Sequence, residues 1–192
     1  MIQSNGSESK WDIGIICMED KGGMYHYFIN FCTMLNDLGY ALYCILLSDS
    51  ETPIPSIERD NLHIKFVHIG RGVLKISKIF PRLVDKNVMN EISISGVNKW
   101  IIVWDSYFLG TIDYDNLQAA LVIHDVEPHA ATGFRKIANK ILFVRSVKKR
   151  SKVDFLITNS HYQHNVPSLN YPEKKVLYFH MPSTVTDNVN LA

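Results

Sequence analysis

Apolar residues along the chain gather in short runs bounded by polar residues, and most of these runs are apolar almost without interruption. Continuous runs of this kind are typical of strands buried on both faces of a parallel sheet, whereas half-exposed strands alternate between apolar and polar positions. The pattern predicts strands at Asp12–Met18, Ala41–Leu47, His63–Ile69, Trp100–Trp104, Ala120–His124, Asp154–Thr158 and Lys175–Phe179.

Three segments between these strands have the spacing of amphipathic helices. The first apolar stripe comprises Met24, Phe28, Phe31, Leu35 and Leu38. Gly39 follows this stripe, where a glycine ends a helix as its C-cap. The second stripe comprises Leu83, Val84, Val88 and Ile92. The third helix is expected from about Thr132 to Val147, with a stripe of Phe134, Ile137, Ala138, Ile141 and Leu142.

Strand and helix alternate along the chain, and this order is typical of right-handed βαβ crossovers. It predicts an α/β fold with a single Rossmann-like, doubly wound, mostly parallel sheet and helices on both faces. The polar, proline-bearing segment between residues 48 and 62 is predicted to be a loop. A length of 192 residues suits one domain, expected at 11–192, after a polar and disordered lead-in at residues 1–10.

Charge and hydropathy exclude several classes of function. The chain has 20 basic and 19 acidic residues, so its net charge of +1 predicts no electrostatic attraction to nucleic acid. No apolar stretch reaches the roughly 18 residues that span a bilayer. The polar N-terminus lacks the apolar core of a signal peptide, and we therefore expect a cytoplasmic domain.

Ligands of a doubly wound sheet bind at the carboxyl ends of its strands. Gly22 and Gly23 follow the first predicted strand, but the sequence around them is neither a Walker A loop nor a G-x-G-x-x-G fingerprint. A strand–Gly-Gly–helix joint offers free N–H groups and a helix dipole to a phosphate or a sugar hydroxyl. A plain turn that requires positive φ is the alternative, and this stretch alone leaves both open.

Neither cysteine nor histidine predicts a metal site. The three cysteines lie in apolar segments and form no C-x-x-C pair, so they are expected to be small buried residues. The histidines lack carboxylate or thiolate partners at metal-binding spacing. We therefore expect no bound metal.

Five segments, in this order, carry a resemblance to a known family: "KGGMYHYFINFCTMLNDLGYALYCILL", "IIVWDSYF", "ALVIHDVEPH", "VDFLITNSHYQHN" and "KKVLYFHMPSTV". Together they resemble the N-terminal, acceptor-side domain of GT-B fold glycosyltransferases of the family-4-like group. In that family a second Rossmann-like domain holds most of the nucleotide-sugar, usually with a Glu-x7-Glu pair. This chain has no such pair, and Met181-Pro182 replaces the usual Asn-Gly. The resemblance therefore implies half of a GT-B fold, which needs a C-terminal domain in cis or in trans.

The resemblance also implies roles for particular residues. Gly22 and Gly23 would line the substrate cleft, close to the donor phosphates or the acceptor. His124 would be catalytic and face the transferred sugar, where an imidazole can stabilise developing charge. Asp105 and Glu127 would orient acceptor hydroxyls. The alternative for His124 is a strand-end histidine satisfied by local hydrogen bonds.

The function implied is transfer of a sugar from a nucleotide-sugar donor to a glycan or lipid-linked acceptor, in polysaccharide or glycolipid synthesis. The nucleotide-sugar is a substrate, and no permanently bound cofactor is expected. The alternative is a non-catalytic Rossmann-like subunit that partners a separate transferase. The basic run "RSVKKRSK" at residues 145–152 is expected to be a solvated surface, with peripheral contact to anionic lipid at the inner membrane surface as the alternative.

Overall fold

The structure is a computed structural model. It describes residues 10–17, 20, 22–48, 50, 55–59, 61–69, 82–103, 117–123, 137, 144, 150–158 and 173–179. Two helices are defined in this part of the chain, α1 (Gly22–Asp37) and α3 (Arg82–Ser95). The strands are β1 (Ile13–Cys17), β2 (Leu42–Ser48), β3 (Ile57–Arg59), β4 (Leu62–His68), β5 (Lys99–Ile102), β6 (Gln118–Ile123), β7 (Phe155–Thr158) and β8 (Lys175–Tyr178).

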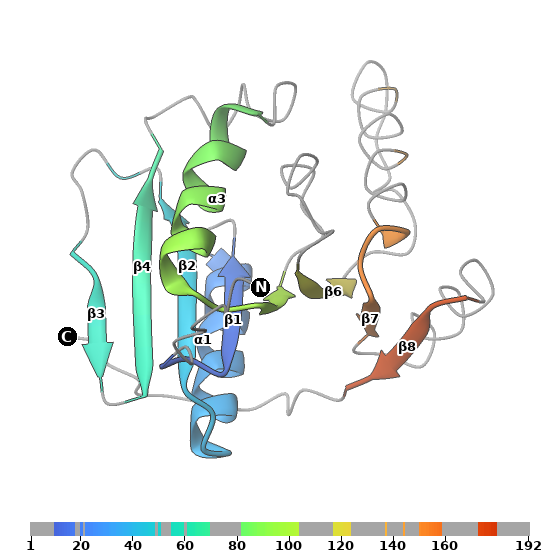
Figure 1. The fold of residues 1–192 in the computed structure, drawn as a ribbon, viewed down its shortest axis with the longest axis horizontal. Coiled ribbons are helices and arrows are strands. Elements are labelled where there is room, and N and C mark those ends of the chain that lie inside the picture. Colours follow the sequence, from blue (N-terminus) through green and yellow to red (C-terminus); the bar gives the residue numbers. More distant parts are fainter. Residues whose placement is uncertain are drawn as a thin grey trace, which may run out of the picture.

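These strands form one eight-stranded sheet in the order β3-β4-β2-β1-β5-β6-β7-β8 (Figure 1). Every neighbouring pair is parallel except β3 and β4, which pair antiparallel. Without the short β3, the order is that of a doubly wound Rossmann-like sheet, in which the chain moves outward from β1 on one side and then returns to build the other. The predicted fold class is therefore confirmed.

All seven predicted strands are present, and no end differs from its prediction by more than two residues. The prediction of a loop between residues 48 and 62 was wrong at two points. Ser48 is the last residue of β2, and Ile57–Arg59 forms β3, an edge strand that pairs with β4. β3 is only three residues long and two of them are exposed, so it leaves no apolar run in the sequence.

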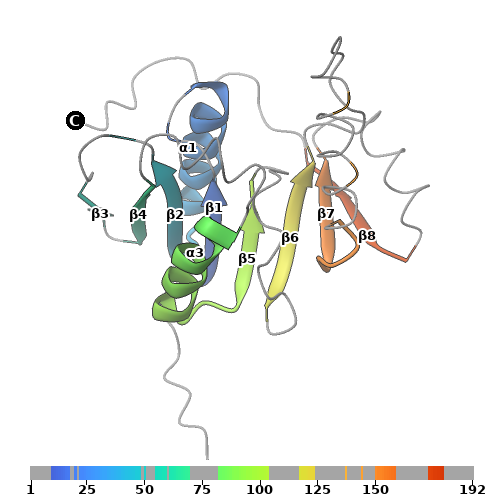
Figure 2. The same cartoon turned by 90° about the horizontal axis from the view of Figure 1, so that it is seen from above.

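The two helices cover opposite faces of the sheet, as predicted (Figure 2). Alternate residues of β2 show the division, because Cys44 packs with Phe28 of α1 whereas Ile45 packs with Val88 of α3. All seven residues of β2 are buried. The continuous apolar runs in the sequence thus correspond to strands with a core on each side.

The first helix ends in a Schellman motif. Gly39 has a φ of 91°, and its N–H donates to the Asn36 carbonyl at 2.9 Å, while the N–H of Tyr40 donates to the Leu35 carbonyl at 3.2 Å. This confirms Gly39 as the C-cap. It corrects the predicted apolar stripe at its end, because Leu38 lies in the turn after the helix and is 67% exposed.

Two aspartates make the same pair of hydrogen bonds near the amino ends of strands. Asp12, just before β1, accepts a hydrogen bond from the Ala41 N–H at 2.8 Å and donates its own N–H to the Ala41 carbonyl. Asp154, just before β7, does the same with Ala119, again with a carboxylate contact of 2.8 Å. Both aspartates were predicted as strand residues. Instead, each uses its side chain to satisfy a neighbouring backbone donor.

Trp100 of β5 fixes the identity of Gly14 in β1. The two residues are register partners, and a Cβ on Gly14 would lie 2.4 Å from the buried Trp100 ring. The indole N–H donates to the Val97 carbonyl at 2.8 Å, which holds the ring in place. Gly14 therefore provides the space in which a large aromatic side chain crosses the neighbouring strand.

Most of the third predicted helix lies outside the described residues. Ile137, expected in its buried stripe, is exposed. Arg150, in the basic run that was expected to be solvated, is 4% exposed, whereas Ser151 and Lys152 are exposed. In the ranges that the structure describes, no helix has both the length and the apolar character that a membrane span requires.

Candidate ligand site at the carboxyl edge of the sheet

The order of the strands defines a point at which a ligand site is expected. β2 and β4 lie on one side of β1, and β5 to β8 lie on the other. Connections therefore leave the carboxyl ends of β1 and β5 in opposite directions, and the crevice between them is where open α/β sheets bind their ligands. Gly22 and Gly23 follow β1 and open α1 at this edge, as the sequence predicted.

The two glycines differ in what their backbone requires. Gly22 has a φ of 74°, a conformation that residues with a Cβ rarely adopt, so its identity follows from the turn itself. Gly23 has no positive φ and lies within α1. A Cβ on Gly23 would meet no heavy atom of the described residues within 4 Å. Neither the backbone nor the packing of the described residues explains the second glycine.

The first turn of α1 presents donors at this edge. The first four N–H groups of a helix have no partner within the helix, and the helix dipole adds partial positive charge at the same end. The first turn of α1 itself contains no acidic residue, and Asp20 lies two residues before the helix. Gly22 and Gly23 are both exposed, and neither has a side chain that would block access to these N–H groups. Such N–H groups donate hydrogen bonds to a phosphate or to a hydroxyl oxygen, which accepts them.

A hydrogen bond joins Asp20, a residue between β1 and α1, to the end of β2. The Ser48 hydroxyl, at the carboxyl end of β2, donates a short hydrogen bond to the Asp20 carboxylate. The same hydroxyl oxygen accepts the Ser50 N–H at 3.1 Å. This arrangement ties the residues after β1 to the end of β2. It went unnoticed in the sequence because Ser48 was assigned to a loop, and only the pairing of β1 with β2 brings the two side chains together.

Asp20 also affects Tyr25, on the first turns of α1. Partial burial raises the pKa of the Tyr25 hydroxyl above its usual value, and the negative charge of Asp20 raises it further. The ring of Tyr25 lies 5.9 Å from that of the exposed His26. Tyr25 therefore remains a neutral hydroxyl at physiological pH, able to donate or accept one hydrogen bond beside the glycines.

Two further features lie at the carboxyl ends of the last strands. Thr158 ends β7 and is fully buried, and its hydroxyl has no hydrogen-bond partner among the described residues. Buried hydroxyls in native proteins almost always have one, so Thr158 is a polar group whose partner is still to be identified. Phe179, directly after β8, packs edge-to-face on Phe31 of α1 with ring centroids 6.0 Å apart. The end of β8 thus lies against the helix that the two glycines open.

Only part of the predicted site falls within the described residues. Gly22 and Gly23 are described, whereas Asp105, His124 and Glu127 lie outside the described ranges, and their roles stay predictions. The strands that precede them, β5 and β6, are neighbours in the sheet and point the same way. Among the residues that the structure describes, no three His, Cys, Asp or Glu side chains are grouped to hold a metal ion.

Comparison with solved structures identifies the fold. Sucrose-phosphate synthase from Thermosynechococcus elongatus aligns with a TM-score of 0.67 at 11% identity, over 91% of this chain and 49% of the synthase chain. A second structure of that synthase gives a TM-score of 0.59 at 11% identity, over 91% of this chain and 90% of the other. UGT2 from Phytolacca americana, complexed with UDP-2fluoro-glucose and pterostilbene, gives 0.55 at 11% identity, over 92% of this chain and 56% of its own.

The chain therefore has the α/β Rossmann-like fold found in these GT-B glycosyltransferases, and it spans about half the length of the first synthase chain and of UGT2. No protein-family model matches the chain, and no curated protein matches it in sequence. At 11% identity the likeness is one of fold, and function has to be argued from the site.

Proposed function

We propose that this chain is the acceptor-binding, N-terminal half of a GT-B glycosyltransferase, which transfers a sugar from a nucleotide-sugar donor to a glycan or lipid-linked acceptor. Gly23 carries the proposal. It is a second glycine at the topological switch point, and neither its backbone conformation nor its packing against the described residues requires a glycine. Close approach of a ligand to the backbone is a physical reason for a residue without a side chain at such a position.

The comparisons support the same proposal. The chain aligns with about half of each larger transferase and with 90% of the shorter synthase chain, as one half of a two-domain unit would. The structure of UGT2 is described as a complex with a UDP-sugar, a donor of the class proposed here. The first turn of α1, with its free N–H groups, is suited to oxygens of such a donor or of an acceptor.

The proposed mechanism divides the work between two domains. This chain would hold the acceptor and contribute His124 beside the transferred sugar, with Asp105 and Glu127 binding acceptor hydroxyls. A C-terminal domain, in cis or in trans, would hold the nucleotide. Holding both reactants in line supplies a proximity effect of about 7–11 kcal/mol. Half a cleft lacks that effect, so we expect no transfer by these 192 residues alone.

The test is product formation from a panel of nucleotide-sugars and acceptors, with and without a C-terminal GT-B domain supplied covalently or as a partner chain. Turnover should require the second domain, and His124→Ala should then lower it by about tenfold or more. His68→Ala, at the exposed carboxyl end of β4 and two strands away from β1, is the matched control and should keep full activity. Transfer by the isolated chain would refute the half-enzyme proposal, whereas an unchanged rate in His124→Ala would remove only that residue from the mechanism.

The same assay separates the alternative, a non-catalytic partner of a complete transferase. A subunit of that kind would raise the turnover of its partner without contributing to the cleft. Gly23→Val would then leave the stimulated rate unchanged. A loss of turnover in Gly23→Val, with folding retained, favours the catalytic half.

A further inference from the structure

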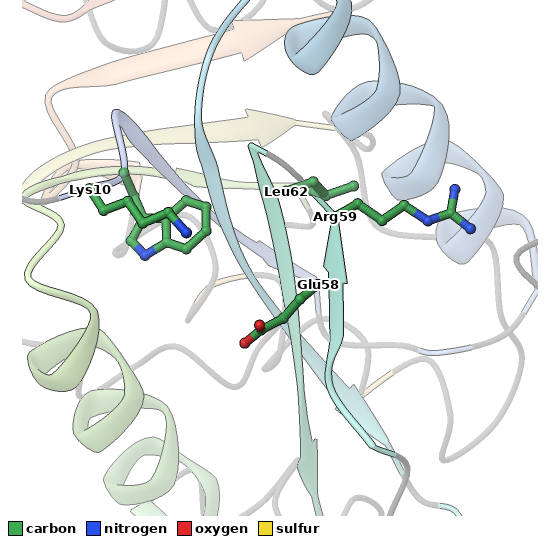
Figure 3. Close-up of a pocket in the computed structure, with 5 residues that line it drawn as sticks. Lys10, Glu58, Arg59 and Leu62 are labelled. Carbon is green, nitrogen blue, oxygen red and sulfur yellow. The ribbon is translucent and has the colours of Figure 1, made fainter.

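A pocket of about 200 Å³ lies far from the glycines, at the opposite edge of the sheet. It is lined by Lys10, Trp11, Glu58, Arg59 and Leu62 (Figure 3). Leu62 begins β4 and Trp11 precedes β1, so the pocket opens at the amino ends of the parallel strands. Nothing in the proposed transferase chemistry uses this edge, because the ligands of a doubly wound sheet bind at its carboxyl ends.

The side chains of this pocket have complementary chemistry. Lys10 Nζ lies 4.5 Å from the centroid of the Trp11 ring. Glu58 lies on β3, the strand that pairs antiparallel with β4, and its side chain is 78% exposed. In Figure 3 the Arg59 side chain points away from Lys10 and Glu58, as expected for adjacent residues of one strand. An ammonium group, a carboxylate and an indole ring therefore face the pocket together.

A partly buried histidine, His63, contacts two of these groups. His63 Nδ1 lies 3.1 Å from Glu58 Oε1, and the His63 side chain is only 13% exposed. The Trp11 ring lies 5.9 Å from the His63 ring. His63 is itself stacked on Tyr43 at 4.8 Å, and the Tyr43 hydroxyl donates to the Glu91 carboxylate at 3.2 Å. Side chains that are oriented before a ligand arrives lose less freedom when it binds.

The chemistry of the lining selects among ligands. A carboxylate only accepts hydrogen bonds and an ammonium only donates them, so the ligand between them has to do both. Sugar hydroxyls do both, and the C–H face of a sugar ring packs on an apolar aromatic surface. A phosphate would meet the Glu58 carboxylate as well as the cations Lys10 and Arg59, and the described lining has no second carboxylate for a metal ion. The volume is below the roughly 300–1,000 Å³ of pockets for drug-sized molecules, which favours a single ring.

We propose that this pocket binds one neutral sugar ring of a saccharide, through the Trp11 indole, the Glu58 carboxylate and the Lys10 ammonium. Lys10 is exposed, and its contact with the indole is a weak one that a ligand can displace. The ammonium then donates to a hydroxyl at the rim. The site is separate from the carboxyl edge and does not depend on the proposed transferase function.

The experiment titrates the full chain with methyl glycosides of neutral hexoses and of N-acetylglucosamine, followed by ligand-observed NMR and calorimetry. At least one glycoside should bind with a Kd on the order of millimolar. Glu58→Gln should weaken that binding by about tenfold, because a charge-assisted hydrogen bond is lost. Glu173→Gln, an equally conservative change at an exposed glutamate before β8, is the control and should leave the Kd unchanged.

Trp11→Phe provides a second variant, since it keeps an aromatic ring against the core while removing the indole. Circular dichroism confirms that each variant is folded before it is titrated. The proposal is overturned if no glycoside binds, or if Glu58→Gln and Trp11→Phe both bind as the unchanged chain does. Tighter binding of inorganic phosphate or of uracil than of any glycoside would also overturn it. Binding that is lost in Gly23→Val but kept in Glu58→Gln would place the sugar at the other edge.

Discussion

Replacing each of the two adjacent glycines with alanine separates a residue that the fold requires from one that it does not. Gly22 has a φ of 74°, and an alanine there would adopt the left-handed conformation at a cost of about 1–2 kcal/mol. Gly23 is helical, and a Cβ there would meet no atom of the described part of the chain within 4 Å. Glycine in a helix is less favourable than alanine by up to about 1 kcal/mol. Gly22→Ala should therefore destabilise the domain, and Gly23→Ala should leave its stability unchanged or raise it.

The assay is urea unfolding followed by circular dichroism, with thermal melting as a second measurement. A change of 1 kcal/mol moves the melting temperature of a domain of this size by about 2–4 °C. Gly22→Ala should thus melt several degrees below Gly23→Ala. Activity should follow a different order, because a side chain at residue 23 stands between a ligand and the free N–H groups of α1. In the two-domain enzyme, Gly23→Val should lose turnover although its fold is stable.

Two results would refute this reasoning. If Gly23→Ala is destabilised as much as Gly22→Ala, then Gly23 has a structural role and no longer points to a ligand. If Gly23→Val keeps both full stability and full turnover, no ligand approaches the backbone at this position. Either result would remove the main support for placing the substrate cleft at the start of α1.

Three other predictions follow from the packing. Gly14→Ala should lower the free energy of unfolding by about 1–3 kcal/mol, measured in urea, because its Cβ would overlap the Trp100 ring; an unaltered midpoint would mean that the ring moves aside. Ser48→Ala should cost about 1–2 kcal/mol through the lost hydrogen bond to Asp20, and a neutral result in the same assay would show that water replaces it. The three cysteines should react with a thiol reagent only after unfolding, since all are buried and burial raises the pKa of Cys32; rapid labelling of native protein would contradict this packing.

The fold followed from the sequence because its central strands are buried on both faces. A strand such as β2, apolar at nearly every position, can satisfy its backbone only between two neighbours and its side chains only between two layers. The C-cap at Gly39 was equally local, since left-handed φ is a property of the residue. The glycine pair after β1 was also visible, but the sequence could not distinguish the glycine of a turn from that of a ligand site. The structure shows that the backbone angle requires a glycine at residue 22, whereas the ligand role of Gly23 stays a proposal.

Tertiary structure decided the features in which residues far apart in sequence meet. Asp12 and Asp154 look like the first residues of strands. Instead, the carboxylate of each accepts a hydrogen bond from a backbone N–H near the amino end of a neighbouring strand. The pocket of Trp11 and Glu58 exists only because β3 turns back antiparallel on β4, a pairing too short to leave a pattern of its own. Hydrophobic periodicity records which face of an element is buried. It carries no information on which polar side chain lies opposite, because that depends on register and strand order.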